Sequence, residues 1–399
     1  MPFVYTLEAM PPLASYDVAV IGAGPAGSRT AAILASLGHR VGLLEQHAEP
    51  GQPVHCTGIV SDECFQRYEL PASLVIRSDN SFVLRSPSGR GAPVRRKAVQ
   101  AHVLDRAALD RWLAARAVEA GADLLTSTVV EDVRWTGTGV QLAATVHGEP
   151  ALIEARVAVV ATGFGAPVAR KLGMGQAGEV LAGCQAVVDA YDVDAVEVFT
   201  GDALGRGGYG WLVPWKPGLA LAGLLTRRHT MTYLQHHVAR LQDSGRVGPI
   251  QEVFRCRPIP LGLPSRTVSD GVVGVGDVAG QVKPTTGGGI YYALLGADAA
   301  AWTVAEALEA GDVSASALAP YEERWRAAME TEIRQGMLLR NLLEQLPESA
   351  IEHLHRLLGV PVLRRVLVAA APSFDWHSRK LTRVLQHFDR SRDAVHAST

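Results

Sequence analysis

The sequence contains few cysteines, and their arrangement matches neither a metal site nor a disulfide framework. Of the 399 residues, four are cysteine, at Cys56, Cys64, Cys184 and Cys256, and no two of them form a CxxC pair. Zinc sites and small disulfide-bonded domains need closely spaced cysteines. The sequence therefore predicts no bound metal, and its scattered thiols favour a location in the reducing cytoplasm.

Net charge and long apolar runs are lacking as well. With 38 basic and 40 acidic residues the formal net charge is −2, so the composition does not indicate nucleic acid as a partner. No segment reaches the roughly 18 uninterrupted apolar residues that a membrane-spanning helix requires. Residues 1–15 lack the basic start and long apolar run of a secretory signal. Any contact with a membrane would therefore be peripheral.

A glycine-rich turn near the start of the chain predicts a dinucleotide site. An apolar run from Tyr16 leads into Gly22-Ala-Gly-Pro-Ala-Gly27, a helical pattern follows to Leu37, and a second strand ends at Glu45. The three glycines would permit the tight turn, the approach of the backbone to a pyrophosphate and the packing of helix on strand. The pyrophosphate would lie at the helix N-terminus, and the Glu45 carboxylate would bind the ribose hydroxyls. This motif alone does not separate NAD from FAD.

A second glycine-rich segment favours FAD. Residues 272–280 read Val-Val-Gly-Val-Gly-Asp-Val-Ala-Gly and resemble the Gly-Asp motif of the glutathione-reductase-type flavoproteins, whose aspartate holds the ribityl chain. The segment Pro284 to Ile290 then opens a long helix, whose N-terminus would point at N1 and O2 of the flavin and stabilise its anionic reduced form. A buried turn and helix without a ligand is the alternative interpretation.

These patterns predict an α/β fold. We expect a Rossmann-like FAD-binding domain, an inserted antiparallel-sheet substrate domain and a C-terminal helical region. The predicted boundaries are an extension over 1–15, a discontinuous FAD-binding domain over 16–175 and 262–315, a substrate domain over 176–261 and helices over 316–399. The proline-rich segment 50–100 is predicted to be an irregular excursion that lines the flavin site.

Three segments together resemble the geranylgeranyl reductase family, and the last of them is most similar to its archaeal-lipid type. They are Pro53-Val-His-Cys-Thr-Gly-Ile-Val-Ser61, Tyr209-Gly-Trp-Leu-Val-Pro214 and residues 276–290. Enzymes of this family use FAD to saturate the double bonds of isoprenoid chains. The resemblance, over about residues 16–310, therefore implies a reductase of C=C bonds in a geranylgeranyl or polyprenyl lipid.

The motifs and the resemblance together define the expected FAD contacts. Arg106 begins a helix where related flavoproteins use an arginine near the cofactor, although a solvated charge at a helix start is the alternative. The complete expected set is Gly22, Gly24, Pro25, Ala26, Gly27, Glu45, Gln46, Cys56, Thr57, Gly58, Arg106, Val130, Gly163, Gly276, Asp277, Gly287, Gly288, Gly289 and Ile290.

The implied reaction also predicts catalytic residues. An isolated alkene is a poor hydride acceptor, so reduction would combine a proton at one carbon with a hydride from flavin N5 at the other. An apolar, water-free site is needed, with a proton donor and groups that tolerate a developing cation. Tyr209 and Trp211 alternate on an extended segment and would face the site. We also expect Cys56 to act chemically, while His55 should point away. Ordinary core aromatics and a buried thiol are the alternatives.

Other classes of protein share parts of this pattern. An aromatic-hydroxylase-like monooxygenase is the main alternative, but its usual Asp-Gly pair is here Thr162-Gly163. A flavin halogenase needs a lysine soon after the glycine loop, and this chain has none before Lys97. A non-enzymatic flavin-binding regulator or lipid carrier would not need a helix N-terminus that tunes a cycling flavin.

The electron donor and the membrane contact stay open at this point. The sequence shows no second complete β-α-β nucleotide site, so NADPH, NADH or ferredoxin would dock transiently to reduce the flavin. The apolar stretch from Leu357 to Ala371 contains paired arginines. It would form either an interfacial membrane helix or a helix packed on the protein.

Overall fold

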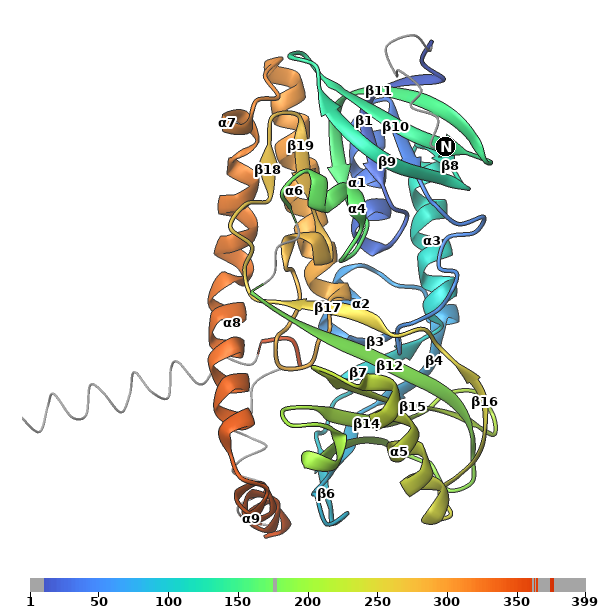
Figure 1. Cartoon of the computed structure of the whole chain (residues 1–399), viewed down its shortest axis with the longest axis vertical. Coiled ribbons are helices and arrows are strands. Elements are labelled where there is room, and N and C mark those ends of the chain that lie inside the picture. The colour runs from blue at the N-terminus through green and yellow to red at the C-terminus, as the bar shows by residue number, and fades with distance from the viewer. Residues whose placement is uncertain (1–10, 175–177, 361, 363, 365–373, 377–399) are drawn as a thin grey trace, which may run out of the picture.

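The computed structural model describes residues 11–174, 178–360, 362, 364 and 374–376, and two large sheets dominate it (Figure 1). The first sheet has the order β18-β19-β11-β1-β2-β8, and β9 and β10 extend it as an antiparallel meander from β11. Its central strands are parallel. The strand bounds are β1 Ala14–Ile21, β2 Val41–Leu44, β8 Asp123–Leu125, β9 Thr128–Trp135, β10 Val140–Val146, β11 Glu149–Val160, β18 Val268–Ser269 and β19 Val272–Gly274.

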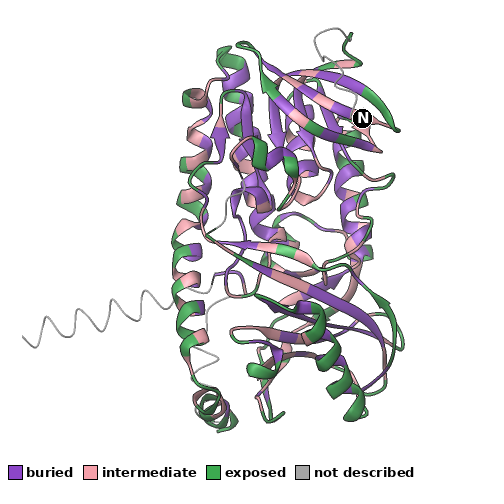
Figure 2. Ribbon diagram, in the orientation of Figure 1, coloured by how far each residue is buried: buried purple, intermediate pink, exposed green. Residues whose placement is uncertain are grey.

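Strand β1 is apolar from Val18 to Ile21 because both faces of this sheet are covered there. Val18 and Val20 face the core formed with the helices α1, α3 and α6, whereas Ala19 and Ile21 face the core under β9 and β10. Successive side chains of a strand point to opposite faces. A strand that is covered on both faces therefore needs a continuous run of apolar residues. Figure 2 shows the central strands of this sheet buried. The helices are α1 Pro25–Ser36, α3 Arg106–Glu119, α6 Ile290–Ala310 and the short α4 Pro167–Lys171.

The second large sheet lies beyond the carboxyl ends of the first sheet's parallel strands. Its order is β16-β12-β15-β14-β13-β5-β6, and β17 also pairs with β12. Helix α5 covers one face, while the other face turns toward the glycine-rich segments of the first domain (Figure 1). The bounds are β5 Ser81–Arg85, β6 Gly91–Arg95, β12 Glu179–Ala190, β13 Val196–Thr200, β14 Tyr209–Pro214, β15 Leu219–Thr226, α5 Thr230–Asp243, β16 Val247–Val253 and β17 Arg257–Leu261.

The expectation of an irregular excursion over 50–100 is wrong. This segment contains β3 Ile59–Ser61, helix α2 Asp62–Arg67, the 3₁₀ turn η2 Ala72–Leu74, β4 Val75–Asp79, β5 and β6. Strands β3 and β4 pair with β7 Ala101–Leu104 in a small third sheet, whereas β5 pairs in parallel with β13 of the second large sheet. The second sheet is thus not purely antiparallel, and two of its strands precede the predicted substrate domain in the sequence.

The C-terminal helices run along the side of the molecule (Figure 1). After α7 Ala315–Leu318 comes the long α8 Pro320–Gln345 and then α9 Glu348–Gly359. Tyr321, Trp325, Met329 and Ile333 recur every four residues and are fully buried against α6 and the first sheet. This agrees with the expected helices up to residue 359, and most of the sequence beyond it lies outside the described residues.

Candidate active site

The glycine turn after β1 has the geometry of a pyrophosphate cradle. Gly22 has a φ of +105°, and a Cβ atom added at Gly27 would lie 1.9 Å from Gly22 O. Gly24 is the N-cap of α1 and receives no side-chain cap, and a Cβ added there would meet nothing within 4 Å. The first turn of α1, which begins at Pro25, therefore opens onto free space where an anion could bind its N–H groups.

Glu45 lies beside this turn. Its buried carboxylate accepts a hydrogen bond from Ala23 N at 2.9 Å and another from His47 N at 2.9 Å. Its backbone carbonyl accepts from Thr128 N at 2.8 Å, which brings the start of β9, with Val130, close to Glu45. Gln46 is exposed beside it. The arrangement fixes the carboxylate next to α1, where a ribose bound with its pyrophosphate on that helix would reach it.

The two glycine motifs meet in space. Gly276 begins the 3₁₀ turn η4 Gly276–Ala279 with a φ of +78°, and a Cβ added there would lie 3.1 Å from the Ala26 Cβ. Gly163, with a φ of +70°, follows β11 just after Ala161, whose carbonyl lies 2.6 Å from an added Cβ at Gly22. The ends of β1, β11 and β19 therefore converge on one opening, as in other doubly wound sheets.

The Asp277 side chain provides a carboxylate that a bound ligand could use as a hydrogen-bond acceptor. Burial raises its pKa to about 6, against the opposing charge of Arg106. Within the described part of the chain the carboxylate accepts no hydrogen bond, and its Oδ1 atom lies 3.0 Å from a Cβ added at Gly289. It therefore sits between η4 and the start of α6, where the hydroxyls of a ribityl chain would satisfy it.

Cys56 folds against Arg106. The Arg106 guanidinium contacts both Asp110 and the Cys56 thiol. Burial disfavours the charge of Arg106, but Asp110 and then Cys56 outweigh it and hold its pKa above the ordinary value. Its buried Nε atom has no hydrogen-bond partner among the described residues. Gly58, with a φ of +76°, lets this loop approach closely, because an added Cβ would lie 2.4 Å from Leu104 O.

These features fit FAD. The free space at Gly24 lies in the turn whose Ala26 meets Gly276, and the neighbouring Asp277 is close both to Arg106, whose Nε has no partner among the described residues, and to Gly289 at the start of α6. A dinucleotide with a ribityl chain and a planar ring offers a pyrophosphate, hydroxyls and carbonyl groups in that order. The residues present therefore suit the cofactor that the sequence predicts.

Across the expected FAD path lies one face of the second sheet. Trp211 pairs with Gly223 and Gly223 with Gln185, so the three residues form a row across β14, β15 and β12. The indole lies over Gly223, where an added Cβ would be 2.4 Å from it. Gln185 accepts a hydrogen bond from the Thr57 hydroxyl at 2.8 Å. The row thereby brings Trp211 and the Cys56 loop to the same place.

Tyr209 lies beside this row and is tied to the flavin side. Its ring centroid is 5.8 Å from that of Trp211, which confirms that the two side chains share one face. Its hydroxyl donates to the carbonyl of Thr286, directly before Gly287. Burial raises its pKa above the ordinary value. An apolar cluster surrounds it, formed with Leu181, Leu225, Ile259, Leu261, Val282 and Met337.

The structure adds residues that the sequence did not reveal. Gln185 and Asp110 both hold predicted site residues, through Thr57 and Arg106 respectively. Gln185 stands in the apolar strand β12 and is almost fully buried, so a lone amide in an apolar run was the available signal. Its Nε2 atom has no hydrogen-bond partner among the described residues, which leaves a donor on the site face.

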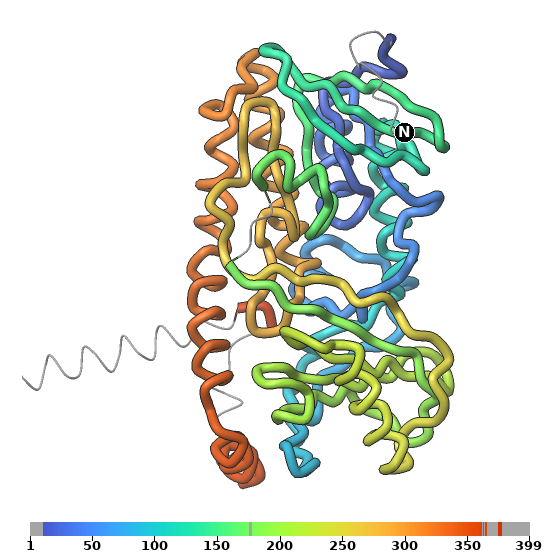
Figure 3. The backbone as a smooth tube through the Cα atoms, viewed as in Figure 1, coloured from blue at the N-terminus to red at the C-terminus, as the bar shows by residue number. Residues whose placement is uncertain are grey.

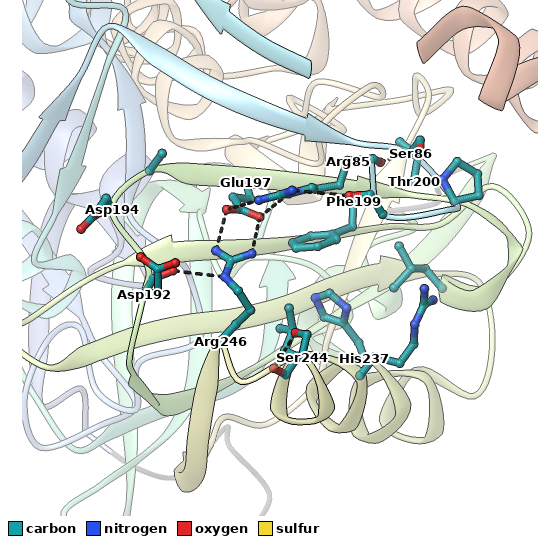
Figure 4. A pocket seen from close by; sticks show the side chains of 16 residues that line it. Arg85, Ser86, Asp192, Asp194, Glu197, Phe199, Thr200, His237, Ser244 and Arg246 are labelled. Atoms are coloured by element: carbon teal, nitrogen blue, oxygen red, sulfur yellow. Dashed lines mark hydrogen bonds and ion pairs between the residues drawn. The ribbon is translucent and has the colours of Figure 1, made fainter. Parts of the chain in front are cut away.

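A cavity of about 460 Å³ lies on the opposite face of this sheet, between α5 and β13 (Figure 4). At its wall Glu197 pairs with Arg85 at 2.7 Å and with Arg246 at 2.6 Å. Burial works to raise the pKa of Glu197, but the hydrogen bonds from the two arginines hold it below the ordinary value. His237 packs there edge-on against Phe199. Because Tyr209 and Trp211 point away from it, this cavity is separate from the predicted site.

Among the described residues, no group of three or more His, Cys, Asp or Glu side chains could hold a metal ion. No helix in the described ranges is both long enough and apolar enough to cross a membrane.

The fold and the site define an FAD-binding oxidoreductase, and comparison with known proteins supplies the family. The model of the lycopene cyclase protein family matches residues 17–360. Digeranylgeranylglycerophospholipid reductase 2 of Methanothermobacter thermautotrophicus is 34% identical over 362 residues, covering 86% of this chain and 91% of that protein. The corresponding reductase of Methanocaldococcus jannaschii is 30% identical over 361 residues, covering 86% and 90%.

Solved structures share the fold. A geranylgeranyl bacteriochlorophyll reductase-like protein from Thermoplasma acidophilum superposes with a TM-score of 0.82 at 22% identity, covering 92% of this chain and 99% of that one. The p-nitrophenol 4-monooxygenase of Pseudomonas putida gives a TM-score of 0.69 at 16% identity, covering 89% and 97%. The chain therefore belongs to the geranylgeranyl reductase family of FAD-dependent oxidoreductases, and to the lycopene cyclase protein family that the model describes.

Proposed function

We propose that this protein reduces the C=C bonds of an isoprenoid lipid with a geranylgeranyl or polyprenyl chain. The observation that carries the proposal is the sheet face of Trp211, Gly223 and Gln185, which is flanked by apolar side chains and meets the Cys56 loop beside the predicted flavin path. An isoprenoid chain needs such a surface, apolar and closed to water. The names of the archaeal relatives support the same substrate class.

Some site residues would bind FAD, and others would assist the protonation of the lipid. When bound, reduced FAD supplies the hydride. The FAD contacts expected from the sequence, from Gly22 to Ile290, would hold it along the path described above. Trp211 would present its ring to the carbon where positive charge develops. Glycine at 223 lets the indole lie close against the sheet, because an added Cβ would be 2.4 Å from the Trp211 ring.

Cys56 is the proposed proton donor. Its thiol contacts Arg106 and accepts from Gly58 N at 3.4 Å, so it is held in place beside the flavin path. Burial first, and then Arg257, lower the pKa of His55 to about 4, so this ring is neutral near pH 7 and has no proton to give as an acid. A guanidinium beside the thiol would stabilise the thiolate left after proton transfer.

An anaerobic experiment tests the proposal. The bound FAD is reduced with dithionite, a geranylgeranyl lipid is added, and reoxidation is followed by absorbance while the lipid is weighed by mass spectrometry. Reduction predicts reoxidation and a gain of two hydrogens per double bond. A product of unchanged mass would indicate cyclisation, and reoxidation only by oxygen with an aromatic substrate would indicate a monooxygenase.

The role of Cys56 has its own test. The Cys56→Ala variant should still bind FAD but, once loaded with it, lose at least about 100-fold in the rate of lipid-driven reoxidation, which is the usual contribution of a general acid. Cys56→Ser keeps the size of the side chain but offers a poorer acid. Its rate of reoxidation should therefore lie between those of the wild type and Cys56→Ala. Unchanged rates in both variants would dismiss the thiol as the proton donor.

A transient donor would reduce the flavin, as the lack of a second nucleotide motif in the sequence indicates. NADPH, NADH and reduced ferredoxin are the candidates. Stopped-flow reduction of the oxidised protein with each donor, under anaerobic conditions, identifies the one that bleaches the flavin fastest.

We further propose that α9 rests on a lipid surface. Its polar side faces the protein, where Glu352 accepts from the Ser88 hydroxyl at 2.8 Å and the buried His355 lies 3.2 Å from Thr200 Oγ1. Its apolar side is exposed instead, with Leu354 and Leu357 about half accessible. A helix with this reversed polarity suits an interface with lipid, and the substrate would come from that lipid.

Vesicle binding tests this contact. Flotation with anionic phosphatidylglycerol vesicles should recover the wild-type protein, and L354E/L357E should abolish recovery. V118E/V129E is the matched control, because Val118 and Val129 are similarly exposed on other elements. If the double variant changes the oligomeric state but not vesicle binding, the surface contacts a second copy of the chain.

A further inference from the structure

A short C-terminal segment, far from the glycine motifs in sequence, lies against the flavin-side turn. Residues Phe374, Asp375 and Trp376, here called the C-terminal clasp, form the short red piece at mid-height in Figure 3, between α8 and the turn that precedes α6. Asp375 pairs with Lys283 at 2.6 Å, and the Phe374 ring lies 4.6 Å from the Lys283 ammonium. Both members of the ion pair are almost fully buried.

Lys283 is built into the turn that the flavin is expected to face. Its N–H donates to Gly288 O at 3.0 Å, and its carbonyl accepts from Gly287 N at 2.8 Å. A Cβ added at Gly288 would lie 2.9 Å from Lys283 Cε and 3.4 Å from Lys283 Nζ. The ammonium is therefore directly behind Gly288, on the protein side of the turn.

The clasp also holds two neighbouring elements of the site. The Trp376 indole donates to the Glu63 carboxylate at 3.0 Å and stacks on Tyr292, with ring centroids 5.6 Å apart. Glu63 accepts a second bond from Tyr291 at 2.8 Å. Glu63 lies in α2, which follows the Cys56 loop and β3, and the two tyrosines open α6. One segment thus contacts the turn at Lys283, the start of α6 and helix α2.

A buried ion pair beside a redox group acts on that group's charge balance. The Lys283 ammonium favours the anionic reduced flavin, and the Asp375 carboxylate opposes this effect from the far side. The Asp375 Oδ2 atom has no hydrogen-bond partner among the described residues. Among these residues, the Lys283 ammonium therefore balances the negative charge of Asp375. Removing either partner would leave the other charge unbalanced in a poorly solvated place.

We propose that the Lys283–Asp375 pair positions the turn at Gly287 and Gly288 and sets the reduction potential of the bound flavin. The C-terminal segment thereby supplies a positioning residue of the active site. The inference rests on the proposed placement of the flavin ring at the turn and at the start of α6. It requires no assumption about the lipid substrate.

Paired substitutions test it, with the midpoint potential of the FAD-loaded protein measured by spectroelectrochemistry. Asp375→Asn leaves the ammonium unopposed and should raise the potential. Lys283→Gln leaves the carboxylate unopposed and should lower it. Asp375→Glu keeps the charge and should stay near the wild type. Shifts in the same direction for Asp375→Asn and Lys283→Gln, or none in either, would overturn the proposal.

Sulfite binding gives a second measurement that needs little material. Sulfite adds to oxidised flavins as an anionic adduct and bleaches them, so a positive charge near N1 tightens binding. Asp375→Asn should lower the sulfite dissociation constant by at least about threefold and Lys283→Gln should raise it. Trp376→Phe is the control, because it loses the bond to Glu63 without changing the charge, and sulfite binding should stay as in the wild type. A Trp376→Phe change as large as that of Asp375→Asn would show that the clasp acts through packing alone.

Discussion

The Thr57 hydroxyl donates to the side-chain carbonyl of Gln185 across 2.8 Å, and this bond joins the loop of Cys56 to the face of the second sheet. The two residues are 128 positions apart in the sequence. Gln185 in turn lies in register with Gly223 and Trp211. The bond therefore fixes the distance between the proposed proton donor and the aromatic wall of the site.

Loss of this bond should impair turnover more than cofactor binding. Thr57→Val keeps the shape of the side chain but removes the donor, which leaves the buried Gln185 amide without its partner, at a cost of about 1–3 kcal/mol. We expect a lower melting temperature and a slower reoxidation of the reduced flavin by lipid, with a smaller loss of FAD affinity. Thr57→Ser retains the hydroxyl and is the control. A Thr57→Val protein that turns over normally would show that the bond has no part in positioning.

The Tyr209 hydroxyl is engaged in the structure, and this limits its role in catalysis. It donates to Thr286 O, and burial raises its pKa, so both the geometry and the acidity oppose proton transfer to a substrate. We predict that Tyr209→Phe lowers kcat by less than about tenfold, the equivalent of one neutral hydrogen bond. A proton donor would instead account for about 10²–10⁴-fold. Steady-state rates with a geranylgeranyl lipid decide between the two, and a loss in the larger range would make Tyr209 the acid.

The local motifs were predictable from the sequence because each glycine serves its own turn. The turn at Gly22 to Gly27 and the strand, turn and helix around Asp277 lie where the sequence placed them. Alternation along Tyr209 to Pro214 also predicted the shared face of Tyr209 and Trp211. These features depend on neighbours within a few residues, so period and turn chemistry are sufficient.

Long-range pairings were not predictable in this way. Strand β5 is five residues long and pairs with β13, which lies more than a hundred positions later in the sequence. Nothing in the residue pattern of β5 indicates this partner. The same holds for Thr57 with Gln185 and for Lys283 with Asp375. Such contacts follow from how the sheets pack together, and a single sequence reports each side chain's local face but not its distant partner.

Two glycines of the cradle should respond differently to alanine. Gly24 has a φ of −79° and free space at its Cβ position, so Gly24→Ala should change the free energy of unfolding of the FAD-free protein by less than about 1 kcal/mol. Its methyl group would occupy the approach to the pyrophosphate, so FAD affinity should fall at least about tenfold. Flavin fluorescence titration measures the affinity, and chemical denaturation the stability.

Gly27→Ala is the contrasting substitution, because the folded protein has no room for a methyl group at this position. The added methyl would lie 1.9 Å from Gly22 O and 3.2 Å from the Ala161 Cβ. Overpacking of this kind typically costs about 1–3 kcal/mol or more, so the FAD-free variant should be clearly destabilised. Equal stability of the two variants, or normal FAD binding by Gly24→Ala, would contradict the assigned path of the pyrophosphate.

Asp277 should make the FAD-free protein less stable as pH rises. Its folded-state pKa of about 6 lies above the ordinary value of 3.8, because burial disfavours the charge. The folded protein thus holds this proton more tightly than the unfolded chain between about pH 4 and pH 6. The associated stability is complete at about pH 4, declines as pH rises through 6 and is absent at pH 8, a total of about 3 kcal/mol.

Asp277→Asn removes this titration and so isolates it. The FAD-free variant should match the wild type near pH 4 and exceed its free energy of unfolding at pH 8 by up to about 3 kcal/mol, because a neutral amide needs no charge in the buried site. The gain should come with weaker FAD binding, since the ribityl hydroxyls would lose a charged acceptor. Urea denaturation across this pH range and FAD titration at pH 8 measure the two effects. A stability difference independent of pH would mean that Asp277 does not titrate in this range, and undiminished FAD affinity would place the ribityl chain elsewhere.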